Sequence, residues 1–109
     1  MNSFKLESML KGWFIGSFEP AAFQTRACEV AFKKYKAGDK ESAHFHKVAT
    51  EITLVASGNI KMMETMWSEG DIIVLEPGST TSFEAITDAS TVVVKVPGVK
   101  NDKFLLEPS

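Results

Sequence analysis

The sequence predicts an all-β fold, a single small barrel or jelly roll, on the basis of three observations. Apolar and polar residues alternate in short blocks rather than at helical spacing. Gly, Pro, Asn and Asp separate these blocks, and such residues favour turns. The chain has 109 residues, which is enough for one domain and too few for two cores. A small antiparallel sheet closes into a barrel because closure removes its exposed edges.

The first half of the chain divides into one helical turn and four strands. Helical spacing of apolar residues occurs only at 4–11, where one short turn is expected because so few residues cannot sustain a longer helix. Alternation predicts strands at 12–18 (GWFIGSF) and 27–35 (ACEVAFKKY), and the turn-forming KAGDKE ends the second of them. Strands at 42–46 (SAHFH) and 50–57 (TEITLVAS) follow, joined by the short link KVAT.

The second half contains four more predicted strands. SGN precedes the strand at 59–67 (NIKMMETMW), and SEGD precedes the strand at 71–76 (DIIVLE). EPGS precedes the strand at 80–85 (TTSFEA), and TDAS precedes the strand at 90–96 (STVVVKV). Eight short strands at this spacing are typical of a small sandwich or barrel.

A single domain is expected to cover residues 1–109. Its core barrel spans about 12–97, and residues 98–109 form a C-terminal tail. Phe104 to Leu106 are the apolar part of this tail. We expect them to lie against the barrel or against a partner.

Composition and charge argue against several classes of protein. The chain has 12 basic and 14 acidic residues, a formal net charge of −2, so no basic stripe is available to bind nucleic acid. Its apolar runs, such as IIVL, are far shorter than the ~20 residues that span a bilayer. Charges near the N-terminus argue against a secretion signal. Cys28 is the only cysteine, so no intrachain disulfide can form. A cytoplasmic protein without nucleic-acid or membrane partners is expected.

The only two histidines, His44 and His46, lie two residues apart on a predicted strand. Side chains at this spacing point to the same side, so both imidazoles project together and Phe45 points away. Glu51 follows at an odd offset and can enter the same space only from the next strand. Two histidines and one carboxylate on two adjacent strands form a three-ligand face that suits Fe(II), Mn, Ni, Co or Zn. Alternatively, the histidines only hydrogen-bond Glu51 or a ligand.

These three residues belong to a longer pattern that includes two glycines. Gly38, His44, His46, Glu51 and Gly58 follow the spacing G-x5-H-x-H-x4-E-x6-G. In this stretch the sequence resembles the cupins, whose first motif has the same spacing. Every element of that motif is present.

The second cupin motif, G-x5-P-x-G-x2-H-x3-N, is matched only in part. Gly70 and Gly78 stand at its two glycine positions. Glu76 occupies the place of the proline, Thr81 that of the third histidine, and Ala85 that of the asparagine. The departure at Thr81 puts the third histidine ligand of the family in question, and a hydroxyl, a water or nothing is left at that place.

The resemblance implies a cupin-type double-stranded β-helix with one pocket, paired into homodimers. It also implies a divalent metal, Fe, Mn, Ni or Zn, held by His44, His46 and Glu51. Dioxygenase, isomerase and decarboxylase chemistries all occur on this fold, and the fold does not choose between them. The substrate is expected to be a small organic molecule, because a chain this short has few loops to cover a larger one.

Two other roles stay open at this point. A non-catalytic cupin module would bind a small sugar or acid ligand without metal, and Thr81 is the feature that favours it. A structural or interaction role would need neither histidine.

Three residues are expected to line the pocket. Thr81 and Phe83 share one face of a strand, and Met62 is expected there as an apolar gap-filler rather than a metal ligand. Glu76 is the one candidate for a catalytic proton carrier, provided that it faces inward.

Arg26 is the only arginine in the sequence, and several lysines follow it before the histidines. Arg26, Lys33, Lys34 and Lys36 are expected to form a solvated surface. Any of them that lies at the pocket rim would meet an anionic substrate.

Overall fold

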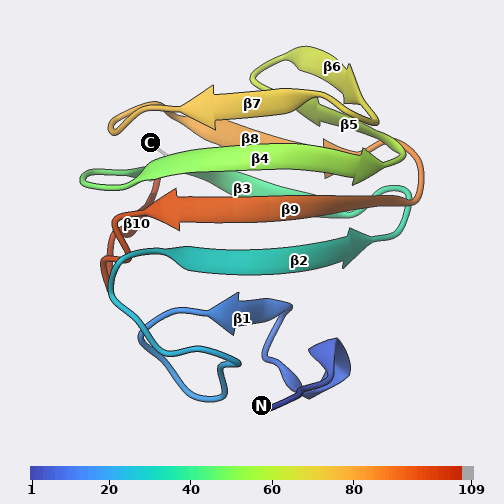
Figure 1. Ribbon diagram of the computed structural model, residues 1–109. Coiled ribbons are helices and arrows are strands. Elements are labelled where there is room, and N and C mark those ends of the chain that lie inside the picture. Colours follow the sequence, from blue (N-terminus) through green and yellow to red (C-terminus); the bar gives the residue numbers. More distant parts are fainter. Residues whose placement is uncertain (107–109) are drawn as a thin grey trace.

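Two five-stranded sheets pack face to face in the computed structural model, which describes residues 1–106 (Figure 1). The front sheet, nearer the viewer in Figure 1, has the order β1 (Trp13–Ile15), β2 (Glu29–Tyr35), β9 (Ala89–Val96), β4 (Thr50–Ser57) and β7 (Ile72–Leu75). The back sheet has the order β10 (Lys103–Leu105), β3 (Lys40–His46), β8 (Thr81–Ala85), β5 (Asn59–Met62) and β6 (Thr65–Ser68). Neighbouring strands are antiparallel, and the predicted all-β jelly roll is confirmed.

The chain crosses repeatedly from one sheet to the other. Apart from the neighbours β1–β2 and β5–β6, successive strands lie in opposite sheets. Residues that are close in sequence therefore face each other across the interior. This topology is the one expected of a jelly roll.

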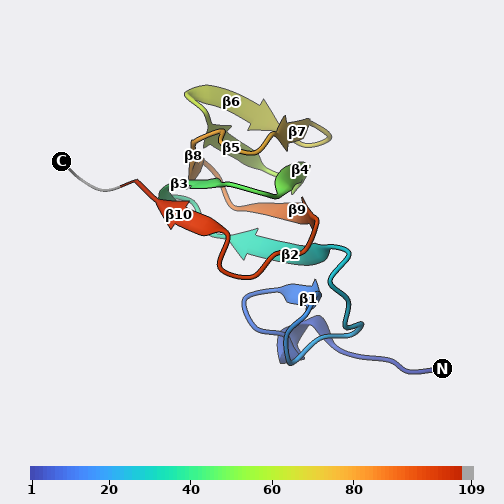
Figure 2. The ribbon, with the colours of Figure 1, turned by 90° about the vertical axis from the view of Figure 1, so that its left-hand side faces the viewer.

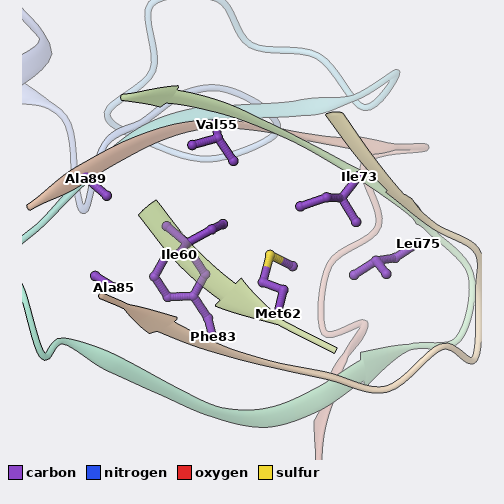
Figure 3. Packing of buried hydrophobic residues seen from close by; sticks show 8 residues of the cluster. All are labelled: Val55, Ile60, Met62, Ile73, Leu75, Phe83, Ala85 and Ala89. Atoms are coloured by element: carbon purple, nitrogen blue, oxygen red, sulfur yellow. The ribbon is translucent and has the colours of Figure 1, made fainter. Parts of the chain in front are cut away.

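Alternation along the strands separates an inner from an outer face. Every second residue of β4 from Glu51 to Val55 is buried, and so are Thr81, Phe83 and Ala85 on β8. Figure 3 shows the main cluster of buried apolar side chains, which consists of Val55, Ile60, Met62, Ile73, Leu75, Phe83, Ala85 and Ala89. This cluster fills one part of the interior, and polar residues line the part toward β2 and β3.

The predicted strand at 59–67 is wrong in one respect, because it is a hairpin of two strands. Met63 and Glu64 join β5 to β6 with φ angles of +54° and +58°. Two consecutive residues with positive φ make the tight turn that suits the twist of antiparallel strands. Neither residue is Gly or Asn, the usual marks of such a turn, so the sequence did not reveal it.

Both chain ends differ in part from a plain barrel. The expected helical turn is the 3-10 helix η1 (Leu6–Ser8). No helix within residues 1–106 has the length and apolar character needed to cross a membrane.

In the C-terminal tail, β10 pairs with β3, and the ring of Phe104 stacks on that of Phe45 with 5.5 Å between the ring centroids. The apolar tail residues thus include an edge strand that the sequence analysis did not predict. Residues 107–109 of the predicted tail lie outside the described residues.

Gly12 brings the N-terminal segment against β2. Its φ is +84°, and a Cβ at this position would collide with the backbone carbonyl oxygen of Phe32. Phe32 in turn donates its N–H to the carbonyl oxygen of Gly12 at 3.0 Å. Trp13, the next residue, is thereby held opposite Ala31 at the start of β1.

Candidate metal centre

His44, His46 and Glu51 converge in the interior from facing sheets. The two histidines lie on β3 in the back sheet, and Glu51 lies on β4 in the front sheet. All three are more than nine-tenths buried, and their ligand atoms lie within 4.8 Å of one another. The sequence predicted these residues on two adjacent strands. These strands are consecutive in the chain but oppose each other across the barrel, because the link 47–49 carries the chain between sheets.

Backbone contacts distinguish the two ring nitrogens of each histidine. Nδ1 of His44 lies 3.1 Å from the carbonyl oxygen of Ser42, and Nδ1 of His46 lies 3.0 Å from that of Asp102. A carbonyl oxygen only accepts hydrogen bonds, so each Nδ1 carries the proton and donates it. In the neutral rings the Nε2 atoms then keep their lone pairs. Histidine ligands in metal sites are oriented by contacts of this kind.

A cation fits between His46 and Glu51. Nε2 of His46 is buried without a hydrogen-bond partner among the described residues, and it lies 3.6 Å from Oε1 of Glu51. Burial acts to raise the pKa of Glu51, but His46, His44 and Lys95 together hold that pKa below its ordinary value. A carboxylate and the lone pair of a neutral imidazole both need a positive partner. A proton or a metal ion supplies it, and this donor set suits a divalent metal.

Asp102 holds the link between the ligands. Its buried carboxylate accepts hydrogen bonds from the N–H groups of Lys47, Val48 and Ala49 at 2.9–3.1 Å. Burial acts to raise the pKa of Asp102, and these three N–H groups outweigh it and lower the pKa. The same residue holds the ring of His46 through its carbonyl oxygen. Asp102 could not be predicted from the sequence, because nothing in the tail marks a partner more than 50 positions earlier.

Thr81 lies directly beside the histidines. It pairs with His44 in the register of β3 and β8, and it is buried. Its hydroxyl donates a hydrogen bond to the carbonyl oxygen of Ser82 at 3.0 Å. The place at which the resemblance expects a third histidine is therefore occupied by a shorter side chain.

A bulge in β3 sets which of its side chains face inward. Glu41 pairs with Phe83 while His44 pairs with Thr81, so two residues of β3 between these pairs oppose one of β8. This irregularity lets Glu41 and His44, an odd number of positions apart, both line the interior. An unbroken strand would direct one of them outward.

A cavity of about 490 Å³ lies beside the three candidate ligands. Thr81, Phe83 and Met62 line it, and the ring of Phe83 meets that of Tyr35 at 4.3 Å. Glu76 lies outside this lining, in the exposed turn that follows β7. Its exposed position gives no support to the suggestion that it faces inward as a proton carrier, because Leu75 is buried and adjacent residues of an extended chain point to opposite sides.

Charged residues form a row on the inner face of the front sheet. Glu29, Lys95 and Glu51 are paired in register across β2, β9 and β4. Nζ of Lys95 lies 3.4 Å from Oε1 of Glu29 and 4.8 Å from the ring centroid of Trp13. Nζ of Lys33 lies 5.1 Å from the same centroid. Lys33 was expected on a solvated surface or at the pocket rim, and it lines the cavity.

No protein-family model matches this sequence, and no curated protein matches it. Solved structures match it through the fold. An uncharacterised conserved protein with a double-stranded β-helix domain from Klebsiella pneumoniae has a TM-score of 0.70 and 22% identity, over 77% of this chain and 74% of that one. KdgF from Halomonas sp. has a TM-score of 0.61 and 19% identity, over 67% and 72% of the two chains. Bacillus subtilis oxalate decarboxylase, studied for its Mn(II) centres, has a TM-score of 0.65 and 20% identity, over 75% of this chain and 25% of that one.

At these identities the likeness concerns the fold. The chain has the cupin-type double-stranded β-helix of these proteins. It spans about three quarters of the first two and about a quarter of the oxalate decarboxylase. Within this fold, His44, His46 and Glu51 can hold a metal ion.

Proposed function

We propose that this protein is a small cupin that binds a divalent metal through His44, His46 and Glu51 and acts on a small organic molecule. The observation that carries the proposal is the approach of Nε2 of His46 to Oε1 of Glu51 at 3.6 Å, with the former buried and unpaired among the described residues. The complete first-motif spacing supports it, and so does the fold shared with an oxalate decarboxylase that has Mn(II) centres. Fe, Mn, Ni and Zn all accept such donors.

Each residue of the site has a role that its contacts define. The Nδ1–H bonds of His44 and His46 keep both rings from turning, so their Nε2 atoms stay aimed inward. Glu51 adds one negative charge to the site. Thr81, shorter than histidine, leaves room beside His44 for a substrate atom. A bound divalent metal would supply a Lewis acid that polarises a carbonyl or carboxylate oxygen.

The cavity beside the candidate ligands limits the size of the substrate. A volume of about 490 Å³ suits a small molecule rather than a polymer. Dioxygenase, isomerase and decarboxylase chemistries are all compatible with these ligands. The oxalate decarboxylase neighbour favours the last of them, on fold-level analogy alone.

Elemental analysis of the untagged protein tests this proposal. Wild type is expected to contain about one equivalent of iron, manganese, nickel or zinc. His44→Ala and Glu51→Ala should each lose most of it, while Glu84→Ala, which removes a carboxylate that shares β8 with Thr81 but not its inward face, should keep it. A wild type that stays metal-free after anaerobic reconstitution with Fe(II) would contradict the proposal.

A non-catalytic binding module is the second candidate, and Thr81 is the observation that favours it. Without a third histidine, His44 and His46 would hydrogen-bond a small sugar or acid instead of a metal. Such a module would gain thermal stability from the ligand without consuming it. Turnover that depends on added metal would rule this candidate out.

We also propose that the partner of this chain is a second copy of itself, seated on the outer face of the front sheet. Register places two apolar rows across four strands there. One row contains Val74, Ile52, Val94 and Val30, and the other contains Ile72, Leu54, Val92 and Phe32. Ile72 and Val74 are more than half exposed, and no other described element crosses this face (Figure 1).

The absence of charge on these two rows favours a second copy over another partner. The two rows carry no charge, so the face is complementary to itself. At ~4.8 Å between strands and ~7 Å between alternate residues, four strands and two rows cover on the order of 270 Å², about a third of the area that one partner gives to a standard interface. The N-terminal segment, in which Phe4 is exposed, extends from the barrel on the same side (Figure 2) and would add to the contact.

A further inference from the structure

The cavity holds a second group of polar side chains, separate from the metal ligands. Lys33 on β2 and Thr91 on β9 lie directly opposite each other in the strand register, and both line the cavity. Residues paired in this way have Cβ atoms about 5 Å apart on the same face. Their side chains therefore reach the same part of the cavity.

Thr91 has hydrogen-bonding capacity that the described residues leave unused. It is 1% exposed, and its Oγ1 has no partner in that part of the chain. The phenol of Tyr35 lies near this hydroxyl, and their interaction acts to lower the pKa of Tyr35. Burial raises the pKa of Tyr35, so this phenol stays protonated at neutral pH. A buried hydroxyl without a partner is unusual and indicates a missing ligand group or water.

The ammonium group of Lys33 is partly buried and has no carboxylate partner among the described residues. The ion pairs there do not include it, and its closest defined neighbour is the ring of Trp13 at 5.1 Å. Lys95, over the same ring, is instead paired with Glu29. Burial lowers the pKa of Lys33, against the opposing effect of Glu41. An ammonium in this environment is stabilised by an anion that enters the cavity.

The charges that line the cavity are balanced before a ligand binds. The lysines are Lys11, Lys33, Lys95 and Lys103, and the glutamates are Glu19, Glu29, Glu41 and Glu51. A divalent metal on Glu51 would make this lining positive, and a ligand with one or two negative charges would restore neutrality. The positive charge of the lining rests on the proposed metal function, whereas the unpaired ammonium of Lys33 does not.

The pair Lys33 and Thr91 lies at a different depth along the strands from the candidate metal ligands. Lys33 follows Glu29 by four positions on β2, and Glu29 shares a register row with Lys95 and Glu51. Four strand residues span about 13 Å, and the side chains at both ends shorten the gap. A ligand that touches both groups needs several atoms between its polar ends.

We propose that Lys33 and Thr91 form a binding subsite for the carboxylate of a small organic acid, whose other polar end lies at His44, His46 and Glu51. Lys33 balances the carboxylate charge, Thr91 donates a hydrogen bond to it, and Trp13 bounds the subsite on one side. A neutral sugar would leave the ammonium of Lys33 without an anionic partner.

A carboxylate fits this subsite better than a phosphate. One free ammonium and the hydroxyls of Thr91 and Tyr35 offer few donors for a doubly charged group with three free oxygens. Glu41 also lines the cavity and would repel the second charge. Phosphate is therefore a useful comparison in the test.

Isothermal titration with succinate, glutarate, adipate, glutaramic acid and inorganic phosphate tests the proposal. Chelator-treated and metal-reconstituted protein are titrated in parallel. At least one dicarboxylate should bind wild type, and Lys33→Met should weaken it about tenfold or more in both forms, as expected for a lost charge-assisted hydrogen bond. Lys34→Met, the exposed neighbour on the same strand, is the matched control and should change the affinity less than twofold.

Two further variants separate binding from folding. Thr91→Val should weaken binding severalfold while keeping the melting temperature near that of wild type, and Lys33→Arg should restore most of the affinity. Equal affinities in Lys33→Met and Lys34→Met, no binding of any dicarboxylate to wild type, or tighter Lys33-dependent binding of phosphate would each overturn the proposal. Lys33-dependent binding in protein that takes up no metal would sustain this subsite while the proposed metal function fails.

Discussion

Nδ1 of His46 lies 3.0 Å from the backbone carbonyl oxygen of Asp102, a residue 56 positions later in the chain. The carboxylate of the same aspartate accepts three N–H groups of the link that leads from His46 to Glu51. One C-terminal residue therefore fixes both the ring of one candidate ligand and the path to another. The tail is thus connected directly to the site.

Removing this carboxylate should weaken both the fold and the metal site. Asp102→Ala leaves the N–H groups of Lys47, Val48 and Ala49 without their acceptor, and we expect a loss of about 2–4 kcal/mol in the free energy of unfolding. Metal affinity should fall about 10- to 100-fold because outer contacts orient the ligands. Urea unfolding and chelator competition measure the two effects. Asp88→Ala, which removes an exposed acceptor of a single N–H group, is the control and should leave metal affinity unchanged.

The free energy of unfolding of the metal-free protein should fall at acidic pH because Asp102 becomes protonated. Its pKa in the folded protein lies below that in the unfolded chain, which is about 4. The ionised group therefore stabilises the fold fully above that value, and its contribution is lost as the pH falls through the folded-state pKa. Wild type should lose free energy of unfolding below about pH 4 more steeply than Asp102→Ala. Parallel curves from urea titrations at a series of pH values would contradict this expectation.

A third imidazole can be tested at the position beside His44. Thr81→His places a ring where register pairs the two residues, next to the open cavity, and metal affinity should rise at least tenfold. Thr81→Val, of similar volume but without a donor atom, should produce no increase. Metal titration with a competing chelator measures both variants. An unchanged affinity in Thr81→His would mean that this side chain does not reach the ligands.

The apolar outer face of the front sheet should govern association. Ile72→Glu with Val74→Glu introduces two charges into the proposed contact, and the protein should change from a dimer to a monomer in light scattering coupled to gel filtration. Met66→Glu on β6 is the control, since it charges a similarly exposed apolar residue in the other sheet. A monomeric wild type, or a variant that remains dimeric, would contradict the proposed interface.

Local patterns in the sequence predicted most of the architecture. Alternation and turn residues gave the strands at 50–57 and 80–85 almost to the residue, because side-chain parity needs only neighbouring positions. The hairpin of β5 and β6 was missed because Met63 and Glu64 take positive φ without a glycine to mark it. The strand β10 was missed because a three-residue edge strand carries too little alternation to be read.

The sequence by itself determined that His44 and His46 share a side and that Glu51 must come from another strand, since both follow from period-two parity. Only the tertiary structure decided that Glu51 arrives from the facing sheet, that Asp102 holds the link, and that Lys33 lines the cavity opposite Thr91. It also placed Glu76 outside the cavity. Parity is fixed by adjacent peptide units, whereas these relationships depend on which distant strands pair and in which register. No local spacing encodes that pairing.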